Sequence, residues 1–152
     1  MEPGWEFLLL WLLEGDSSIH FENIDSVFGK LIENISKELN MFFSSGNDFA
    51  IRSEVKRLRD LAYFAGTPRQ LLLSDLISSI ILRKIDNSTW KCLPKYSGLS
   101  ISTWKEALHN NSFIKEFWPA QHLLGQANVL RGKSAIVQMP TSAGKTKATE
   151  LI

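Results

Sequence analysis

The sequence predicts a mainly α-helical protein whose last quarter begins an α/β domain. Two observations carry this prediction. Apolar residues recur at helical spacing over roughly the first 85 positions. A short β-branched stretch, residues 134–139, is followed by a loop of small residues that ends in Gly-Lys-Thr. We therefore expect an α-helical N-terminal domain followed by one strand, a loop and the start of a helix.

The composition is that of a globular protein and leaves the partner open. The chain has 152 residues, 44% of them hydrophobic and 22% charged, so it can bury a core. Its net charge of +1 argues neither for nor against nucleic acid. The single cysteine, Cys92, excludes an internal disulfide and predicts a reducing, cytoplasmic setting. We expect a buried, inert thiol there rather than a catalytic nucleophile.

The first 13 residues contain the apolar run from Phe7 to Leu13. Glu2 and Glu6 precede it where a signal peptide has basic residues, and the run falls short of the roughly 20 apolar residues of a membrane span. The pattern predicts a helix packed into a core or against another domain, and no membrane partner.

Three longer helices are predicted next, over residues 21–43, 49–64 and 68–85, because each has an apolar stripe at steps of three and four. The run from Thr67 to Gln70 is a capping-box start for the third helix. Residues 86–102 are expected to be loop and residues 103–109 a short helix. The domain boundary is expected between Asp86 and Ser112.

The segment 117–152 carries the chemistry. Pro119 begins a helical pattern, Arg131-Gly132 indicates a turn, Ser134–Met139 a strand, Pro140–Thr146 a loop, and residues 147–152 a helix. Strand, small-residue loop, Lys-Thr and helix in this order are the context of a phosphate-binding loop.

The physical basis of that prediction is the anion-binding backbone. Small residues let N–H groups turn toward phosphate, and Gly144 permits unusual dihedral angles. Lys145 supplies a positive charge for the β- and γ-phosphates, and the Thr146 hydroxyl suits a magnesium ion. Met139 stands where the general Walker A pattern has glycine, so the loop departs from that pattern.

Two features resemble the superfamily 2 helicases of the DExH/DEAD type. Residues 140–146 read Pro-Thr-Ser-Ala-Gly-Lys-Thr, and Gln121 lies 24 positions before Lys145 (145 − 121). The resemblance implies that Gln121 binds the adenine of ATP, that Lys145 is catalytic and that Thr146 holds Mg²⁺. It covers only the last quarter of the chain and implies a truncated RecA-like domain over 101–152, while the helical stripes predict an α-helical domain over 1–100. The residues implied to bind ATP are Gln121, Pro140, Thr141, Ser142, Ala143, Gly144, Lys145 and Thr146.

The function so implied is that of an ATP-dependent helicase or translocase, a hydrolase acting on DNA or RNA. Hydrolysis needs a second acidic motif, and these 152 residues contain no Asp-Glu pair. We therefore expect a fragment that binds ATP phosphates but is inactive alone. Two alternatives stay open: a P-loop ATPase of another class, and a non-enzymatic helical interaction module. The sequence names no partner subunit.

The remaining candidates have structural alternatives that the sequence favours. We expect Phe117 and Trp118 to pack in the core rather than stack on adenine. Arg131 and Lys133 are expected in a solvated turn rather than on phosphates.

The basic residues at 52–59 and the three histidines could also bind a ligand. Arg52, Lys56 and Arg59 form a helical stripe that suits a nucleic-acid backbone but is expected to be a solvated face. His20, His109 and His122 lack ligand spacing, so no zinc site is expected.

Overall fold

The computed structural model describes residues 3–14, 27–110, 113–140 and 144–152. These residues are mainly α-helical, as predicted, and within them no strand is present. One isolated antiparallel bridge joins Ser88 to Glu116. The chain forms two compact units, Met1–Arg83 and Lys84–Ile152. The predicted domain limits, 1–100 and 101–152, stay a prediction, while compactness divides the chain at Arg83.

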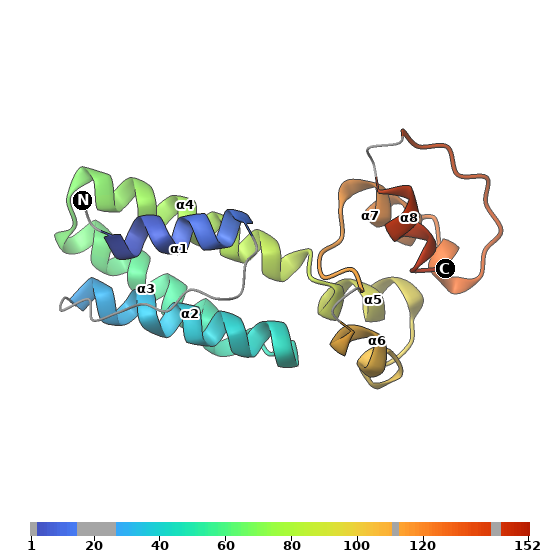
Figure 1. Cartoon of the computed structure of the whole chain (residues 1–152), viewed down its shortest axis with the longest axis horizontal. Helices are drawn as coiled ribbons and strands as arrows, with labels where there is room; N and C mark the ends of the chain where they lie inside the picture. The colour runs from blue at the N-terminus through green and yellow to red at the C-terminus, as the bar shows by residue number, and fades with distance from the viewer. Residues whose placement is uncertain (1–2, 15–26, 111–112, 141–143) are drawn as a thin grey trace. The chain divides into compact units, whose positions relative to one another are not determined.

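The described residues of the first unit form four helices that pack alongside one another (Figure 1). The ring of Trp5 in the first helix contacts Phe28 of the second at 5.3 Å between centroids. An ion pair between Glu6 and Arg69 ties the first helix to the start of the fourth. Arg59 of the third helix pairs with Asp75 of the fourth at 2.6 Å. The helices are α1 (Pro3–Glu14), α2 (Val27–Ser45), α3 (Phe49–Ala65) and α4 (Pro68–Asp86).

The predicted helices of this unit are confirmed where the structure describes them, and the predicted start at residues 21–26 lies outside the described residues. Their apolar stripes form the core, as the buried i, i+4 row Leu73, Ile77 and Ile81 of α4 shows. The capping box is also confirmed. The Thr67 backbone N–H donates to Gln70 Oε1 at 2.8 Å, and the Gln70 N–H donates to Thr67 Oγ1 at 3.3 Å.

The second unit contains short helices where a loop was predicted for residues 86–102. That prediction is wrong because its turn-forming residues are helix caps. Ser88 Oγ accepts from the Trp90 N–H at 3.3 Å, and Gly98 ends the helix with a φ of 73°. The helices of this unit are α5 (Thr89–Ser97), η1 (Ile101–Trp104), α6 (Lys105–His109), α7 (Pro119–Gln126), η2 (Val129–Arg131) and α8 (Lys145–Thr149).

The predicted strand at Ser134–Met139 is not formed. In Figure 1 residues 133–140, which follow η2, form a wide arc. Ile136, at the centre of the predicted strand, is fully exposed. A strand is stabilised by hydrogen bonds to a neighbouring strand, and no strand exists among the described residues to provide them. A pattern of β-branched residues alone therefore does not produce a β-strand.

Within the described segments, no helix combines the length and the apolar character needed to cross a bilayer.

The packing of α3 leads to a stability prediction. Leu58 is completely buried, so Leu58→Ala removes apolar contacts and leaves a cavity. We expect the free energy of unfolding to fall by about 2–5 kcal/mol. Urea unfolding followed by far-ultraviolet circular dichroism measures this loss. Leu72→Ala is the matched control, because Leu72 is exposed and its loss should change stability by less than about 0.5 kcal/mol. Equal effects of the two substitutions would contradict the packing.

Candidate functional site

The predicted phosphate loop is described at its ends. Gly144 immediately precedes α8 in the left-handed conformation, with φ 75° and ψ 42°. Lys145 and Thr146 follow in the first turn of α8, and both are exposed. Pro140 is also exposed, outside any helix. The predicted ligands Thr141, Ser142 and Ala143 lie outside the described residues.

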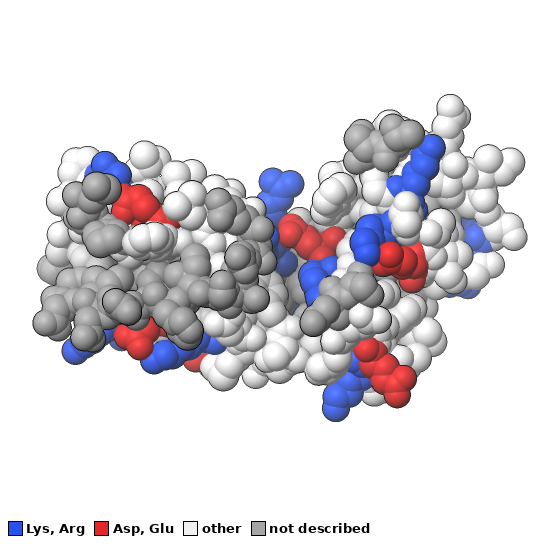
Figure 2. Space-filling model, in the orientation of Figure 1, with Lys and Arg blue, Asp and Glu red and all other residues white. Residues whose placement is uncertain are grey.

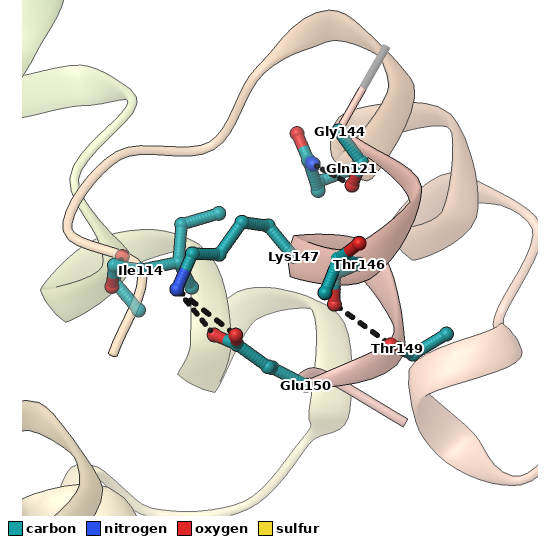
Figure 3. Close-up of polar contacts among 8 residues, drawn as sticks. Ile114, Gln121, Gly144, Thr146, Lys147, Thr149 and Glu150 are labelled. Carbon is teal, nitrogen blue, oxygen red and sulfur yellow. Dashed lines mark hydrogen bonds and ion pairs between the residues drawn. The ribbon is translucent and has the colours of Figure 1, made fainter. Parts of the chain in front are cut away.

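Gly144 is required by its surroundings as well as by its backbone conformation. A Cβ built on it would lie 3.1 Å from Gln121 Nε2 and 3.6 Å from the Trp118 ring, closer to the amide than most real contacts. Its positive φ also disfavours any other L-residue. The Gly144 carbonyl accepts a hydrogen bond from Gln121 Nε2 at 3.4 Å (Figure 3). The residue that begins α8 is therefore held from α7.

Gln121 is fully buried, and both ends of its amide are bonded. Its Oε1 accepts from the Trp118 backbone N–H at 2.8 Å, as in half of a capping box, while Nε2 reaches Gly144. Gln121 is therefore in direct contact with the residue that precedes Lys145. Adenine recognition by Gln121 stays a prediction, and the structure shows that the amide joins the start of α7 to the loop.

Two lysines of α8 differ in their partners. Lys147 Nζ pairs with both carboxylate oxygens of Glu150, at 2.9 and 3.1 Å (Figure 3). Lys145 is exposed and has no hydrogen bond or ion pair within the part of the chain that the structure describes. Thr149 Oγ1 donates to the Thr146 carbonyl oxygen at 2.7 Å, which stabilises the short helix. The charge of Lys145 is therefore available to an anion, and that of Lys147 is neutralised.

The far end of α8 is anchored in apolar contacts. Ala148 packs with Leu124 of α7 and Val129 of η2, and Met139 covers this cluster. Leu151, just after α8, is buried in the core that contains Phe117 and Tyr96. The position of the loop thus depends on α5 and α7.

The helices α5 and α7 approach each other closely at Gly125. A Cβ on Gly125 would lie 2.3 Å from the Tyr96 ring, so only glycine lets the ring pack against α7. The Tyr96 hydroxyl bonds His122 Nδ1 at 2.8 Å. His122 Nε2 lies 3.0 Å from Asn87 Oδ1. Because a carbonyl oxygen only accepts, Nε2 carries the proton and Nδ1 accepts from Tyr96 in the neutral imidazole.

Burial lowers the pKa of His122 below its ordinary value, and the positive charge of Lys95 lowers it further. Neutral His122 is therefore the form that fits this contact. Of the other histidines, His20 lies outside the described residues, and His109 Nδ1 lies 2.7 Å from the Lys105 carbonyl oxygen. In the described segments no three His, Cys, Asp or Glu side chains come together as a metal site.

The aromatic pair before α7 divides between two environments. Phe117 is buried and stacks on Tyr96 at 5.8 Å between ring centroids, which confirms its predicted place in the core. Trp118, which was also predicted to pack in the core, is about half exposed beside Gly144. That part of the prediction is wrong, because Trp118 precedes α7 and its ring covers the glycine.

Arg131 and Lys133 are exposed, as the predicted solvated turn requires, but the Arg131 guanidinium also bonds the end of α5. Arg131 Nε donates to the Tyr96 carbonyl oxygen at 3.1 Å, and its terminal nitrogen donates to that of Lys95 at 3.4 Å. A cation at the last turn of α5 satisfies carbonyls that the helix leaves open. Sequence reasoning missed the roles of Tyr96, His122 and Arg131. The glycine inside the α7 pattern, Gly125, was the one available signal of a close approach.

The cysteine behaves as predicted. Cys92 is buried, and desolvation raises the pKa of its thiol to about 11. At neutral pH it is therefore protonated and does not act as a nucleophile.

The basic stripe of α3 is largely paired with carboxylates. Arg52 bonds Asp48, and Arg59 bonds Asp75, which also accepts from the Tyr63 hydroxyl at 2.8 Å. Hydrogen bonds from Tyr63 and Arg59 lower the pKa of Asp75. On the face shown in Figure 2, basic and acidic side chains lie next to each other within each unit. The predicted solvated face is therefore the better interpretation of this stripe, and a DNA or RNA partner stays a prediction.

The comparisons with known proteins give one relative. The chain is 25% identical over 146 residues to the Hachiman protein HamB of Bacillus cereus. The match covers 91% of this chain and 13% of the relative, so the chain spans about an eighth of the length of that curated protein. No family model matches. No solved structure matches.

These findings correct the resemblance to superfamily 2 helicases. The relative is named as a Hachiman protein, and no helicase family model matches. The strand of a RecA-like sheet is also missing from the described residues. The seven-residue likeness at 140–146 was too short to establish membership, because a loop sequence does not by itself specify the sheet around it. We therefore do not place the chain in that superfamily.

The close approach of α5 and α7 leads to a prediction. Gly125→Ala places a methyl group in the space of the Tyr96 ring, and overpacking of this kind costs about 1–3 kcal/mol. We expect amide hydrogen exchange in α5 and α7 to accelerate about tenfold. Leu123→Ala is the control, because Leu123 lies on the exposed face of α7. Unchanged exchange in Gly125→Ala would show that the ring does not need this space.

Proposed function

We propose that the chain binds the phosphates of a nucleoside triphosphate, ATP with Mg²⁺, through residues 140–146, as the nucleotide-binding part of a Hachiman-type protein. The observation that carries the proposal is the geometry at Gly144. A left-handed glycine, held by Gln121, immediately precedes an exposed lysine and threonine. The similarity to the Hachiman protein HamB supports the second part.

The described residues fit the bound group. Lys145 extends into solvent with no partner among the residues described, so its ammonium can meet the β- and γ-phosphates. The exposed Thr146 hydroxyl can be a ligand of Mg²⁺. Gly144 adopts the left-handed backbone conformation that turns neighbouring N–H groups toward an anion in loops of this kind. Pro140, Thr141, Ser142 and Ala143 complete the proposed loop.

The base would lie beside α7. Trp118 presents part of its ring next to Gly144, where a planar base can stack. Gln121 carries a donor and an acceptor suited to adenine, and it would have to exchange one of its present bonds to use them.

The finer architecture is part of the proposal. In it, residues 134–139 become a strand of an α/β P-loop domain when further strands lie beside them. Two observations support this: the side chains of residues 134–138 are exposed outside any helix, and Ile136 and Val137 favour strands. Hydrolysis of ATP would need an acidic motif besides these residues. The buried thiol of Cys92 supports a reducing, cytoplasmic location.

A helical interaction module is the second candidate function. It is favoured by exposed apolar side chains of the first unit, where Phe64 is 88% exposed and Leu72 61% exposed. If nucleotide binding fails, this candidate becomes the better one.

The role of Lys145 gives a binding prediction. Lys145→Ala removes the charge that faces the phosphates, and a charge-assisted hydrogen bond contributes about 1.5–3 kcal/mol. We expect ATP affinity in the presence of Mg²⁺ to fall about tenfold or more, measured by isothermal titration calorimetry.

The matched control is Lys147→Ala. Lys147 lies two residues after Lys145 on the same helix but already pairs with Glu150. Its loss should therefore leave ATP affinity nearly unchanged. Equal affinities of wild type and Lys145→Ala would overturn the proposal. So would the absence of binding to the wild-type chain at millimolar ATP.

A second expectation concerns turnover. The purified 152-residue chain should release no phosphate from ATP above background, because it contains no Asp-Glu pair to hold Mg²⁺ and orient water. A phosphate-release assay, with Lys145→Ala as the background, measures this. ATPase activity that depends on Lys145 would refute it.

A further inference from the structure

The helix α7 makes two contacts, one with the proposed phosphate loop and one with α5. Gln121 faces Gly144 of the loop, and its neighbour His122 faces α5. Successive residues of a helix point about 100° apart, so one rigid helix presents both side chains in different directions. Interactions that fix the orientation of α7 on α5 therefore also fix the position of the Gln121 amide, which bonds Gly144.

The contact with α5 is a continuous chain of hydrogen bonds. The Tyr96 hydroxyl donates to His122 Nδ1 at 2.8 Å, and His122 Nε2 donates to Asn87 Oδ1 at 3.0 Å. Tyr96 is buried and His122 is partly buried. The rings of Tyr96 and Phe117 lie 5.7 and 5.6 Å from the imidazole between centroids. The side chain of His122 is thus fixed at both nitrogens and on two sides.

We propose that Tyr96, His122 and Asn87 form a clamp that positions α7 and thereby sets the affinity of the phosphate loop. The inference rests on the proposed function, because it concerns the regulation of that same site. None of the three residues is a catalytic residue, since their side-chain hydrogen bonds join them to one another and not to the loop. They act through Gln121 and Gly144.

The clamp depends on the charge of His122. A proton on Nδ1 would reverse the bond to Tyr96 and place a positive charge near Lys95 of α5. The groups packed against the imidazole are the Tyr96 hydroxyl and Lys95 from α5, the Asn87 amide, and the Phe117 ring. No carboxylate pairs with His122 in the described residues.

The direction of the pH effect follows from the lowered pKa of His122. The unfolded or released imidazole binds protons more readily than the clamped one, so the clamp is fully present above the ordinary pKa of 6.5. Its contribution is lost as the pH falls from that value through the lower pKa of the folded state. ATP affinity is therefore expected to weaken in mildly acidic solution.

The experiment compares the wild-type chain with His122→Gln and Tyr96→Phe. His122→Gln removes the titratable group, and Tyr96→Phe removes only the hydroxyl. We expect each to lower ATP affinity about fivefold at neutral pH, which corresponds to about one hydrogen bond. The same substitution at the exposed His109 is the matched control and should have no effect.

The pH profile separates positioning from a structural role. ATP itself titrates in this range, so the informative quantity is the difference between the profiles of wild type and His122→Gln. We expect the wild-type affinity to fall more steeply below pH 6.5. Identical profiles, together with equal affinities, would overturn the clamp and leave the proposed function standing.

Hydrogen exchange, measured without nucleotide, tests the clamp even if the chain binds no ATP. The Ala148 backbone N–H donates to the Gly144 carbonyl oxygen at 2.9 Å, so its hydrogen exchange reports whether that carbonyl is held. We expect exchange at Ala148 to accelerate about fivefold in His122→Gln. If the wild type binds no ATP and the exchange rate at Ala148 is unchanged, both proposals fall. Faster exchange without ATP binding would retain the clamp and reject only the nucleotide.

Discussion

The arrangement of the second unit depends on the missing side chain at Gly125. The Tyr96 ring occupies the space that a Cβ would take, so α7 lies directly against α5. Atoms in a protein interior are packed closely enough that a shift of this helix would be transmitted to its neighbours. Gln121 and His122 lie on the same helix, and Leu124 packs on α8. One close approach therefore determines the position of the proposed phosphate loop.

Burial of Gln121 adds a polar constraint to this packing. A buried amide destabilises the fold unless its donor and acceptor are bonded, and here Trp118 and Gly144 provide the two partners. The bond to Gly144 requires that residue to lie close, and its left-handed backbone in turn requires glycine. The charges complement this geometry, because Lys147 is neutralised by Glu150 while Lys145 extends into solvent.

The parts of the fold that were predicted well are those with local causes. The helices α2, α3 and α4 carry long apolar stripes, and the Thr67–Gln70 capping box involves residues three apart. The predicted loop at 86–102 contains α5 instead, because a short helix with Pro94 inside it and Ser88 as its N-cap carries a weak local signal. Apolar character alone does not place a residue on the stripe: Phe64 is exposed, because six residues from the buried Leu58 it lies about 240° around the helix.

The sequence by itself determined the residue types and their spacing: the helical stripes of the first unit, the Gly-Lys-Thr that begins α8, and a glutamine upstream of it. Only the tertiary structure decided which of these residues meet. Gln121 reaches Gly144 across 23 positions, Tyr96 reaches His122 across 26, and Arg131 reaches the end of α5 across 35. The strand pattern at 134–139 likewise depends on a neighbour elsewhere. Such contacts depend on the packing of whole helices, and that packing is not written in the local spacing of residues.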